Sequence, residues 1–275
     1  MSTTPDLARV RTRSEEELRR IAEEGARRGA ELEARGDLTP ELLADAVLAW
    51  AAEEFGRSLA VACSMADAVL PHVVAEHVPG VDVLFLDTGY HFPETLATRD
   101  RVADLLDVTV VDVLPEQTVA QQDAEHGPRL HDRDPARCCA LRKVEPLRRT
   151  LAGYDAWVTG VRREEGPTRA DTPLVTFDEA FGLVKINPLA AWSFEELLSY
   201  SERELLPANP LLAQGYPSIG CAPCTRPVAP GEDPRAGRWA GFAKTECGLH
   251  PGSASSSPTP TTQPTPTTQP TEEAR

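Results

Sequence analysis

Short apolar runs alternate with helical segments along most of this chain. Five runs between residues 58 and 187 have the length and apolar content of buried strands. The expected strands are residues 58–62, 81–86, 108–114, 156–160 and 183–187, and the expected helices between or beside them are 66–76, 93–106 and 138–151. Apolar strands that alternate with helices predict an α/β fold with a doubly wound, mostly parallel sheet.

Two helices are expected before the first strand. Ser14 followed by Glu17 has the spacing of a capping box, which predicts a helix over residues 14–35. This helix has few large apolar side chains, and two glycines weaken it. We therefore expect residues 1–38 to form an arm that is solvated or that contacts another subunit of a homo-oligomer. A second helix is expected to begin at Thr39, because proline follows it at the first helical position.

The carboxyl ends of the expected strands are where a doubly wound sheet binds its ligands. These ends carry Cys63-Ser64, Asp87-Thr88, Gly160-Val161-Arg162-Arg163 and Asn187-Pro188. The turn at residues 62–67 stands where a phosphate-binding loop would lie, because backbone N–H groups at a helix N-terminus hold anions. It contains no glycine, however, and an ordinary capped helix start explains it equally well.

Four cysteines form a candidate cofactor site. Cys138 and Cys139 are adjacent, and Cys221 and Cys224 form a Cys-x-x-Cys pair. Four thiolates are the ligand count of a zinc site or of an iron–sulfur cluster. Zinc usually takes thiolates from spaced pairs, so the adjacent pair favours a four-iron cluster, in which two neighbouring thiolates can bind different irons. Two disulfides or inert buried thiols are the alternatives.

Basic side chains flank the first cysteine pair and recur in a later loop. Arg137, Arg142 and Lys143 would offset the charge of the thiolates, or they would form a solvated helix face. After residue 200 the periodicity fades into a Pro/Gly-rich loop, whose arginines are Arg226, Arg235 and Arg238. Several arginines near a metal site indicate an anion clamp, and a solvated loop is the alternative.

The pattern divides the chain into four parts. These are the N-terminal arm at 1–38, the α/β domain with the four cysteines at 39–234, the arginine loop and C-terminal segment at 235–250, and a tail at 251–275. The tail is rich in Ser, Thr and Pro and repeats itself once, so it cannot bury apolar area and is expected to be disordered.

Composition narrows the classes of function. The 275 residues include 43 Asp and Glu against 28 Lys and Arg, a formal net charge of −15. Nucleic-acid binders are more often basic, so we expect no nucleic-acid partner. No segment has the length and apolarity of a membrane span, and the N-terminus lacks the apolar core of a signal peptide. Six cysteines in this context indicate a cytoplasmic protein whose thiols bind metal or catalyse.

Six motifs carry a resemblance that spans residues 45–250. They are Cys138-Cys139, Cys221-Ala222-Pro223-Cys224, Leu86-Asp87-Thr88-Gly89-Tyr90, Gly160-Val161-Arg162-Arg163, Arg235-Ala236-Gly237-Arg238-Trp239 and Glu246-Cys247-Gly248-Leu249-His250. Together they resemble the assimilatory sulfonucleotide reductases, specifically the bacterial adenylyl-sulfate (APS) reductases that carry a four-iron four-sulfur cluster. The cysteine set and the last motif are the most specific. The resemblance implies an adenine nucleotide alpha hydrolase-like fold.

The resemblance also implies a reaction. APS would be reduced to sulfite and AMP with thioredoxin as electron donor, in sulfate assimilation and cysteine biosynthesis. Cys247, on a mobile C-terminal segment, would attack the sulfate sulfur and displace AMP. Thioredoxin would then resolve the S-sulfocysteine. One 4Fe-4S cluster would be held by Cys138, Cys139, Cys221 and Cys224.

The substrate-binding residues are likewise implied by the resemblance. Arg235 and Arg238 would grip the phosphosulfate, and Lys143 would lie between the cluster and the substrate. The nucleotide pocket would be lined by Ser64, Asp67, Leu86 and Gly160. The complete expected set is Ser64, Asp67, Leu86, Lys143, Gly160, Arg162, Arg163, Arg235, Arg238 and His250.

The chain departs from the resembled family in its phosphate loop. Relatives often have Ser-x-Ser-Gly-x-x-Asp, whereas Val61, Cys63 and Ser64 precede Asp67 here. Three other functions are therefore weighed. Reduction of 3′-phosphoadenylyl sulfate (PAPS) would need a further basic site, and an ATP pyrophosphatase of related fold would need a glycine-rich loop. A binding module with structural zinc would leave Cys247 and the arginine loop unexplained.

Overall fold

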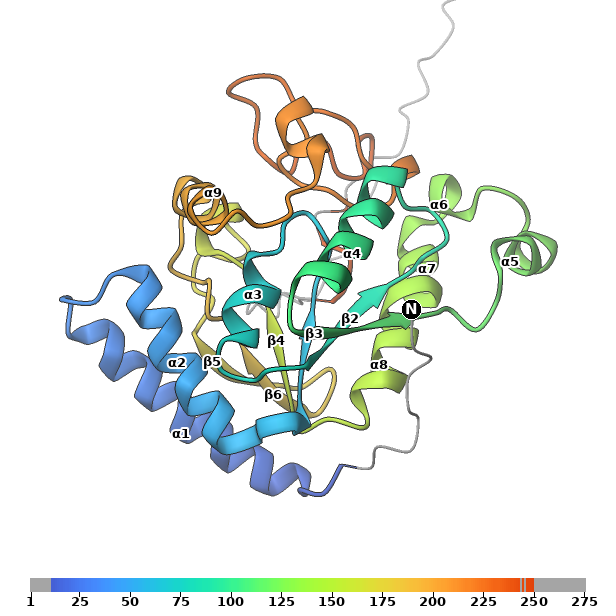
Figure 1. Ribbon diagram of the computed structural model, residues 1–275. Coiled ribbons are helices and arrows are strands. Elements are labelled where there is room, and N and C mark those ends of the chain that lie inside the picture. Colours follow the sequence, from blue (N-terminus) through green and yellow to red (C-terminus); the bar gives the residue numbers. More distant parts are fainter. Residues whose placement is uncertain (1–10, 243, 245, 250–275) are drawn as a thin grey trace, which may run out of the picture.

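A computed structural model describes residues 11–242, 244 and 246–249 (Figure 1). Its sheet consists of β1 (Leu59–Ala62), β2 (Val81–Leu86), β3 (Val108–Val113), β4 (Ala156–Thr159), β5 (Val175–Asp178) and β6 (Leu183–Ile186). The strand order is β3-β2-β1-β4-β6-β5, and every neighbouring pair is parallel except β5 and β6. The predicted α/β fold with a mostly parallel sheet is confirmed, with an unpredicted antiparallel strand at one edge.

Helices surround this sheet. They are α1 (Glu15–Ala34), α2 (Pro40–Phe55), α3 (Val69–Ala75), α4 (Pro93–Leu105), α5 (Val119–His126), α6 (Leu130–Arg133), α7 (Pro135–Cys139), α8 (Glu145–Leu151) and α9 (Phe194–Arg203). Helix α3 lies against β1 and β2, whereas α1 lies against β5 and β6. In the part of the chain that the structure describes, no helix is long and apolar enough to cross a membrane.

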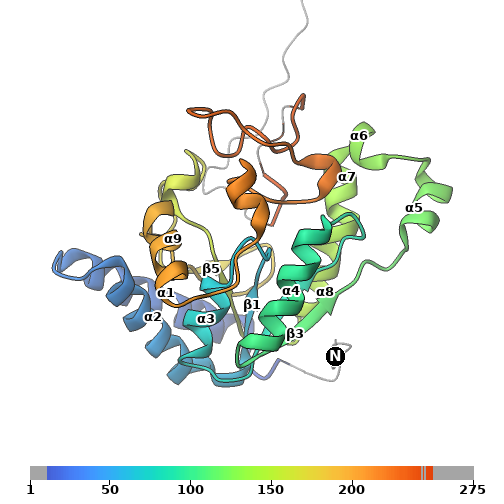
Figure 2. The same ribbon diagram turned by 45° about the horizontal axis from the view of Figure 1, so that its top comes forward.

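The order in which strands are added to the sheet reverses between β1 and β4. It proceeds outward from β1 to β2 and β3, and it then returns through α5 to α8 to place β4 on the other side of β1. A parallel sheet leaves a crevice at such a point, beyond the carboxyl ends of the two strands. Residues 204–242, drawn in orange, run over this edge of the sheet (Figure 2). The backbone N–H of Asn209 donates to the carbonyl of Ala66 there, at 2.9 Å.

Helix α1 packs on the sheet and does not extend into solvent. Its capping box is formed as predicted, and the apolar side chains of Leu18 and Ala22 are buried in the main core. A Cβ added at Gly25 would lie 2.4 Å from the ring of Trp50 and 2.8 Å from Val175. The glycines therefore permit the close approach of α1 to α2 and to β5, which the sequence reading took only as a weakness of the helix.

The turn after β1 differs from its prediction. The helix expected from residue 66 begins at Val69, and Asp67 accepts a hydrogen bond from its N–H at 2.9 Å. Met65 is fully buried and has a φ of +58°, a left-handed conformation that turns the chain sharply here. The backbone N–H of Met65 lies 3.4 Å from the sulfur of Cys63. The turn is thus a compact loop at the crevice.

The helix expected over residues 138–151 is interrupted. Asp134 caps α7 by accepting from the N–H of Arg137 at 2.9 Å. A π-helical segment, Ala140–Val144, then separates α7 from α8. Within it Arg142 turns inward and is 4% exposed, and its guanidinium donates to the carbonyl of Thr88.

Candidate functional site

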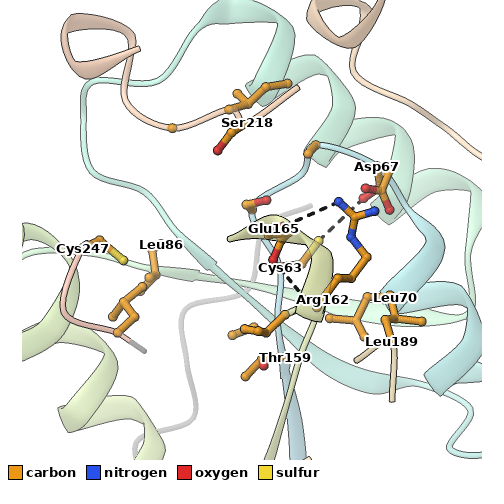
Figure 3. A pocket seen from close by; sticks show the side chains of 18 of the residues that line it. Cys63, Asp67, Leu70, Leu86, Thr159, Arg162, Glu165, Leu189, Ser218 and Cys247 are labelled. Atoms are coloured by element: carbon orange, nitrogen blue, oxygen red, sulfur yellow. Dashed lines mark hydrogen bonds and ion pairs between the residues drawn. The ribbon is translucent and has the colours of Figure 1, made fainter. Parts of the chain in front are cut away.

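A cavity of about 240 Å³ occupies the crevice between β1 and β4 (Figure 3). Cys63, Ser64 and Asp67 reach it from the turn after β1, and Leu86 reaches it from the end of β2. The segment after β4 contributes Gly160, Val161 and Arg162. Apolar walls come from Leu70, Leu189, Phe194 and Leu197. An apolar pocket with polar groups at one end suits a flat ring joined to a charged group.

Carboxyl groups stand beside the turn after β1. Burial raises the pKa of Asp67, although its hydrogen bond from Val69 and the charge of Arg162 oppose the rise. Glu165 accepts from the backbone N–H of Arg162 at 3.0 Å, and its other oxygen lies 3.7 Å from the guanidinium of the same residue. Arg162 therefore faces the cavity with its charge already balanced by a neighbour.

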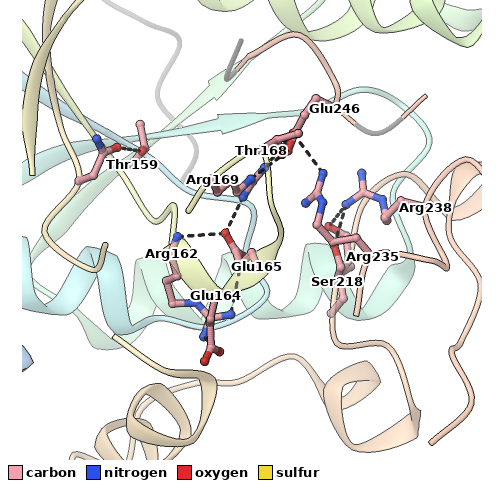
Figure 4. Close-up of polar contacts among 12 residues, drawn as sticks. Thr159, Arg162, Glu164, Glu165, Thr168, Arg169, Ser218, Arg235, Arg238 and Glu246 are labelled. Carbon is pink, nitrogen blue, oxygen red and sulfur yellow. Dashed lines mark hydrogen bonds and ion pairs between the residues drawn. The ribbon is translucent and has the colours of Figure 1, made fainter. Parts of the chain in front are cut away.

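Three more arginines border the cavity (Figure 4). Arg238 donates to the hydroxyl of Ser218 and to the carbonyl of Ile219, both at 3.2 Å, and its guanidinium lies 4.7 Å from the ring centroid of Trp239. Arg235 and Arg169 both donate to Glu246. Five Lys and Arg side chains line the described cavity wall, against the carboxyl groups of Asp67 and Glu165 that line it and that of Glu246, which pairs with two of the arginines. The end of the cavity that these arginines border therefore keeps an excess of positive charge that favours an anion.

Lys143 and Cys247 face the same end of the cavity. Burial opposes the charge of Lys143, but the nearby thiols of Cys221 and Cys247 hold the pKa of its ammonium above the usual value. Cys247 is half-buried and its thiol is free. The thiolate is the nucleophilic form of cysteine, and Cys247 is the candidate for that role in this cavity.

Four thiols surround a second, adjacent cavity. Cys138, Cys139, Cys221 and Cys224 line it, and Lys143 and Trp239 separate it from the first cavity because they line both. All four thiols are free, so disulfides do not account for them. Among the described residues no three His, Cys, Asp or Glu side chains converge closely enough to hold one metal ion. The donor set, four free thiols around one cavity, is the kind that holds zinc or an iron–sulfur cluster.

The four thiols affect one another's pKa. Burial and the neighbouring thiols raise the pKa of Cys138 to about 12 and that of Cys224 to about 11. Burial acts in the same direction on Cys221, but Lys143 and the hydroxyl of Thr88, 3.3 Å from its sulfur, lower its pKa. Four ionised thiols in this space would repel one another, so the arrangement suits a cationic centre.

The structure brings most of the expected site residues together and leaves Arg163 apart. The cavity is lined by Ser64, Asp67, Leu86, Lys143, Gly160, Arg162, Arg235, Arg238 and Cys247. Arg163 instead donates to the carbonyl of Thr172 at 2.8 Å and to Glu33 at 2.6 Å, away from the cavity. His250 lies outside the described residues. Burial raises the pKa of Cys63 to about 12, so this thiol stays protonated.

Comparison with known proteins assigns this site to a family. Residues 58–227 match the phosphoadenosine phosphosulfate reductase domain family. The chain belongs to this family. The adenosine 5'-phosphosulfate reductase of Streptomyces coelicolor is 57% identical over 238 residues, which are 86% of this chain and 97% of that protein. The adenosine 5'-phosphosulfate reductase of Mycolicibacterium smegmatis is 56% identical over 241 residues, 88% of this chain and 98% of that protein.

A solved reductase structure agrees with this assignment. The phosphoadenylyl-sulfate (PAPS) reductase of Candida auris, crystallised as a phosphate complex, matches with a TM-score of 0.60 and 26% identity. The match covers 79% of this chain and all of that one. The resemblance predicted from the motifs is therefore confirmed, and the chain is an oxidoreductase of the sulfonucleotide reductase family.

The sequence reading of this reductase misses Glu165, Arg169 and the contacts of Glu246. Arg169 follows a Gly-Pro-Thr turn, and nothing in its local sequence separates it from a solvated loop residue. It is only 8% exposed, and it connects Glu165 to Glu246. A charged residue six positions after the Gly-Val-Arg-Arg motif was the only signal available.

Proposed function

We propose that this protein reduces APS to sulfite and AMP. The observation that carries the proposal is the place of Cys247, whose thiol faces the cationic end of a cavity at the carboxyl ends of β1 and β4. The names of the similar bacterial reductases support the same substrate. In this proposal the adenosine occupies the apolar part, with Ser64, Asp67, Leu86 and Gly160 around the nucleotide.

The phosphosulfate takes the cationic end. Lys143, Arg235 and Arg238 are the groups that would neutralise it, because all three line that end of the cavity. Guanidinium groups donate parallel hydrogen bonds to such oxygens, which gives both charge and orientation. Arg162 lies nearer the turn after β1, where Glu165 already balances its charge. We retain it as a secondary contact and assign no substrate role to Arg163.

The reaction follows as a sulfur transfer. The thiolate of Cys247 attacks the sulfate sulfur, a sulfur–sulfur bond forms, and the bond from sulfur to the phosphate oxygen breaks. AMP leaves with that electron pair, and the enzyme holds an S-sulfocysteine. A dithiol reductant then attacks the sulfur of Cys247, releases sulfite, and is itself oxidised to a disulfide as Cys247 regains its thiol.

A thioredoxin is the reductant that we propose. Its two thiols supply the two electrons that sulfite formation requires, and no further redox partner is needed. Thioredoxins keep thiols reduced in the cytoplasm, where we place the reaction. His250 lies next to the reacting segment in sequence, and its proposed substrate role rests on the resemblance alone.

A 4Fe-4S cluster is the group that we propose for the second cavity. Cys138, Cys139, Cys221 and Cys224 would hold it, in agreement with their free thiols around one cavity. When bound, it would supply compact positive charge for the four thiolates and set the electrostatics around Lys143. The ammonium of Lys143 would face both the cluster and the phosphosulfate, because Lys143 lines both cavities.

Turnover with matched substrates tests the proposed function. Anaerobic protein with reduced thioredoxin should release one sulfite per APS consumed. PAPS should react far more slowly. It carries an additional 3′-phosphate, and we assign none of the described basic side chains to that group. Sulfite measurement with each nucleotide decides the question. Equal or faster turnover of PAPS would reassign the substrate, and no sulfite from either would reject the proposal.

Replacing Arg238 by alanine should weaken APS binding by about 1.5–3 kcal/mol, the range for hydrogen bonds to charged groups. Ser218 and Ile219 orient the guanidinium toward the cavity, so its loss should appear in binding. Titration calorimetry with APS measures the dissociation constant. Arg163→Ala is the matched control, since Arg163 contacts Thr172 and Glu33 outside the cavity. Equal affinities for the two variants would move the clamp elsewhere.

A further inference from the structure

Glu246, the residue before Cys247, has a role that the reaction described above does not use. Its carboxylate is 14% exposed and accepts two hydrogen bonds from the guanidinium of Arg169, at 3.0 and 2.9 Å. Arg235 donates a third at 3.1 Å, and the hydroxyl of Thr168 a fourth at 3.3 Å. This set of contacts joins the C-terminal segment to two separate loops (Figure 4).

Arg169, which donates to Glu246, is itself held in place by a second contact. The side chain of Arg169 is 9% exposed, and it also donates to Glu165 at 2.5 Å. Glu165 in turn accepts from the backbone N–H of Arg162, in the segment that follows β4. A continuous series of ion pairs therefore runs from the end of a central strand to the residue beside Cys247.

These contacts stabilise the ionised form of the Glu246 carboxyl group. Burial alone would raise the pKa of its carboxyl, but Arg169 and Arg235 hold it below the usual value. Bidentate pairing of a guanidinium with a carboxylate is both directional and strong when water is largely excluded. Removing one partner would leave Arg169 buried with a charge that only Glu165 balances.

Access to Cys247 differs between the two stages of the proposed reaction. Attack on sulfur requires the thiol at the cationic end of the cavity, where the structure places it. A folded protein reductant cannot enter a cavity of about 240 Å³, so the segment must leave before the adduct can be resolved. Something must hold the segment in during the first stage and release it in the second.

We propose that Glu246 is a positioning residue that latches the segment carrying Cys247 into the cavity through Arg169 and Arg235. The closed latch aligns the thiol for sulfur transfer, and the reductant gains access to Cys247 when the latch opens. The proposal rests on the proposed function in taking Cys247 as the nucleophile. It adds that the residue beside the nucleophile acts on the first stage and not on the second.

Alkylation of Cys247 tests the latch without any substrate. Glu246→Gln keeps the side-chain volume but removes the charge, so Cys247 should react with iodoacetamide about tenfold faster than in the wild type, a shift in the range expected for one charge-assisted contact. Mass spectrometry of the peptide that contains Cys247 separates it from the other cysteines. Glu232→Gln is the matched control: Glu232 pairs with Arg226 at 2.6 Å in the same region, outside the cavity, and this variant should match the wild type.

Separate half-reactions give the second readout. With APS and no reductant, Glu246→Gln should form the S-sulfocysteine about tenfold more slowly, whereas reduced thioredoxin should release sulfite from the preformed adduct at least as fast as from the wild type. Glu246→Asp, which keeps the charge, should restore part of the first rate. Equal alkylation of wild type and Glu246→Gln, or equal slowing of both stages, would overturn the latch. An absence of adduct in the wild type would instead reject the proposed function, and the alkylation comparison would still decide the latch.

Discussion

Replacing Cys247 by serine is expected to abolish sulfite release, with turnover falling by roughly three to six orders of magnitude, as is typical when a covalent nucleophile is removed. A serine hydroxyl is not ionised beside Lys143, and an oxygen ester of sulfate could not be opened by thiol exchange. Because Cys247 contributes one side of the cavity only, the variant should still bind APS. Sulfite release and APS affinity, measured on the same preparation, check both parts.

The wild-type protein supplies the complementary measurement. APS without reductant should add one sulfonate, about 80 Da, and peptide mapping should place it on Cys247. Reduced thioredoxin should remove it. Cys63→Ser is the control, because the thiol of Cys63 is kept protonated by burial although it lines the same cavity. An adduct on Cys63, or normal turnover by Cys247→Ser, would contradict this assignment.

Replacing Cys139 or Cys224 by serine is expected to remove the cofactor altogether. Protein purified without oxygen should contain about four irons and four sulfides per chain, and the variants close to none, because a hydroxyl is a poor ligand for iron in such clusters. The variants should also unfold at a lower temperature, since metal binding contributes to folding. Iron and sulfide analysis with thermal unfolding measures both effects.

The same Cys63→Ser variant is the control for this experiment. Its sulfur contacts the turn after β1, at 3.4 Å from the N–H of Met65, and does not line the cavity of the four thiols. Its iron content should equal that of the wild type. Stoichiometric zinc without iron in the wild-type protein would contradict the cluster and favour a structural zinc site.

The fold was largely readable from the sequence because buried parallel strands are continuous apolar runs. All five expected strands are present, within one residue of their predicted ends. The remaining strand, β5, is an edge strand in which the polar Thr176 and Asp178 alternate with apolar residues, so it has no continuous apolar run. Helix α9 was also missed, although its capping box of Ser193 and Glu196 was visible in the sequence.

The candidate site was predictable where chemistry dictates residue type. Cysteine pairs and a Cys-Gly-Leu-His ending carry their own signal, and the structure gathers Cys138, Cys139, Cys221 and Cys224 around one cavity. Arginine carries no such signal, because the same residue serves solvated surfaces and anion sites. Two arginines show how far the prediction reaches. Arg163 lies in the predicted motif but pairs with Glu33 away from the cavity, whereas Arg169 lies outside the motif and borders the cavity.

The π-helical segment Ala140–Val144 changes the direction in which the side chains before it face. A π-helical turn holds about one residue more than an α-helical turn. Each residue turns an α-helix by about 100°, so the extra residue rotates everything before it relative to α8. Cys138 and Cys139 lie before this point, and Lys143 lies within it. Deleting one residue here would make the thiols and the lysine face different directions. Any redesign of this reductase must therefore keep the number of residues between Cys139 and Lys143.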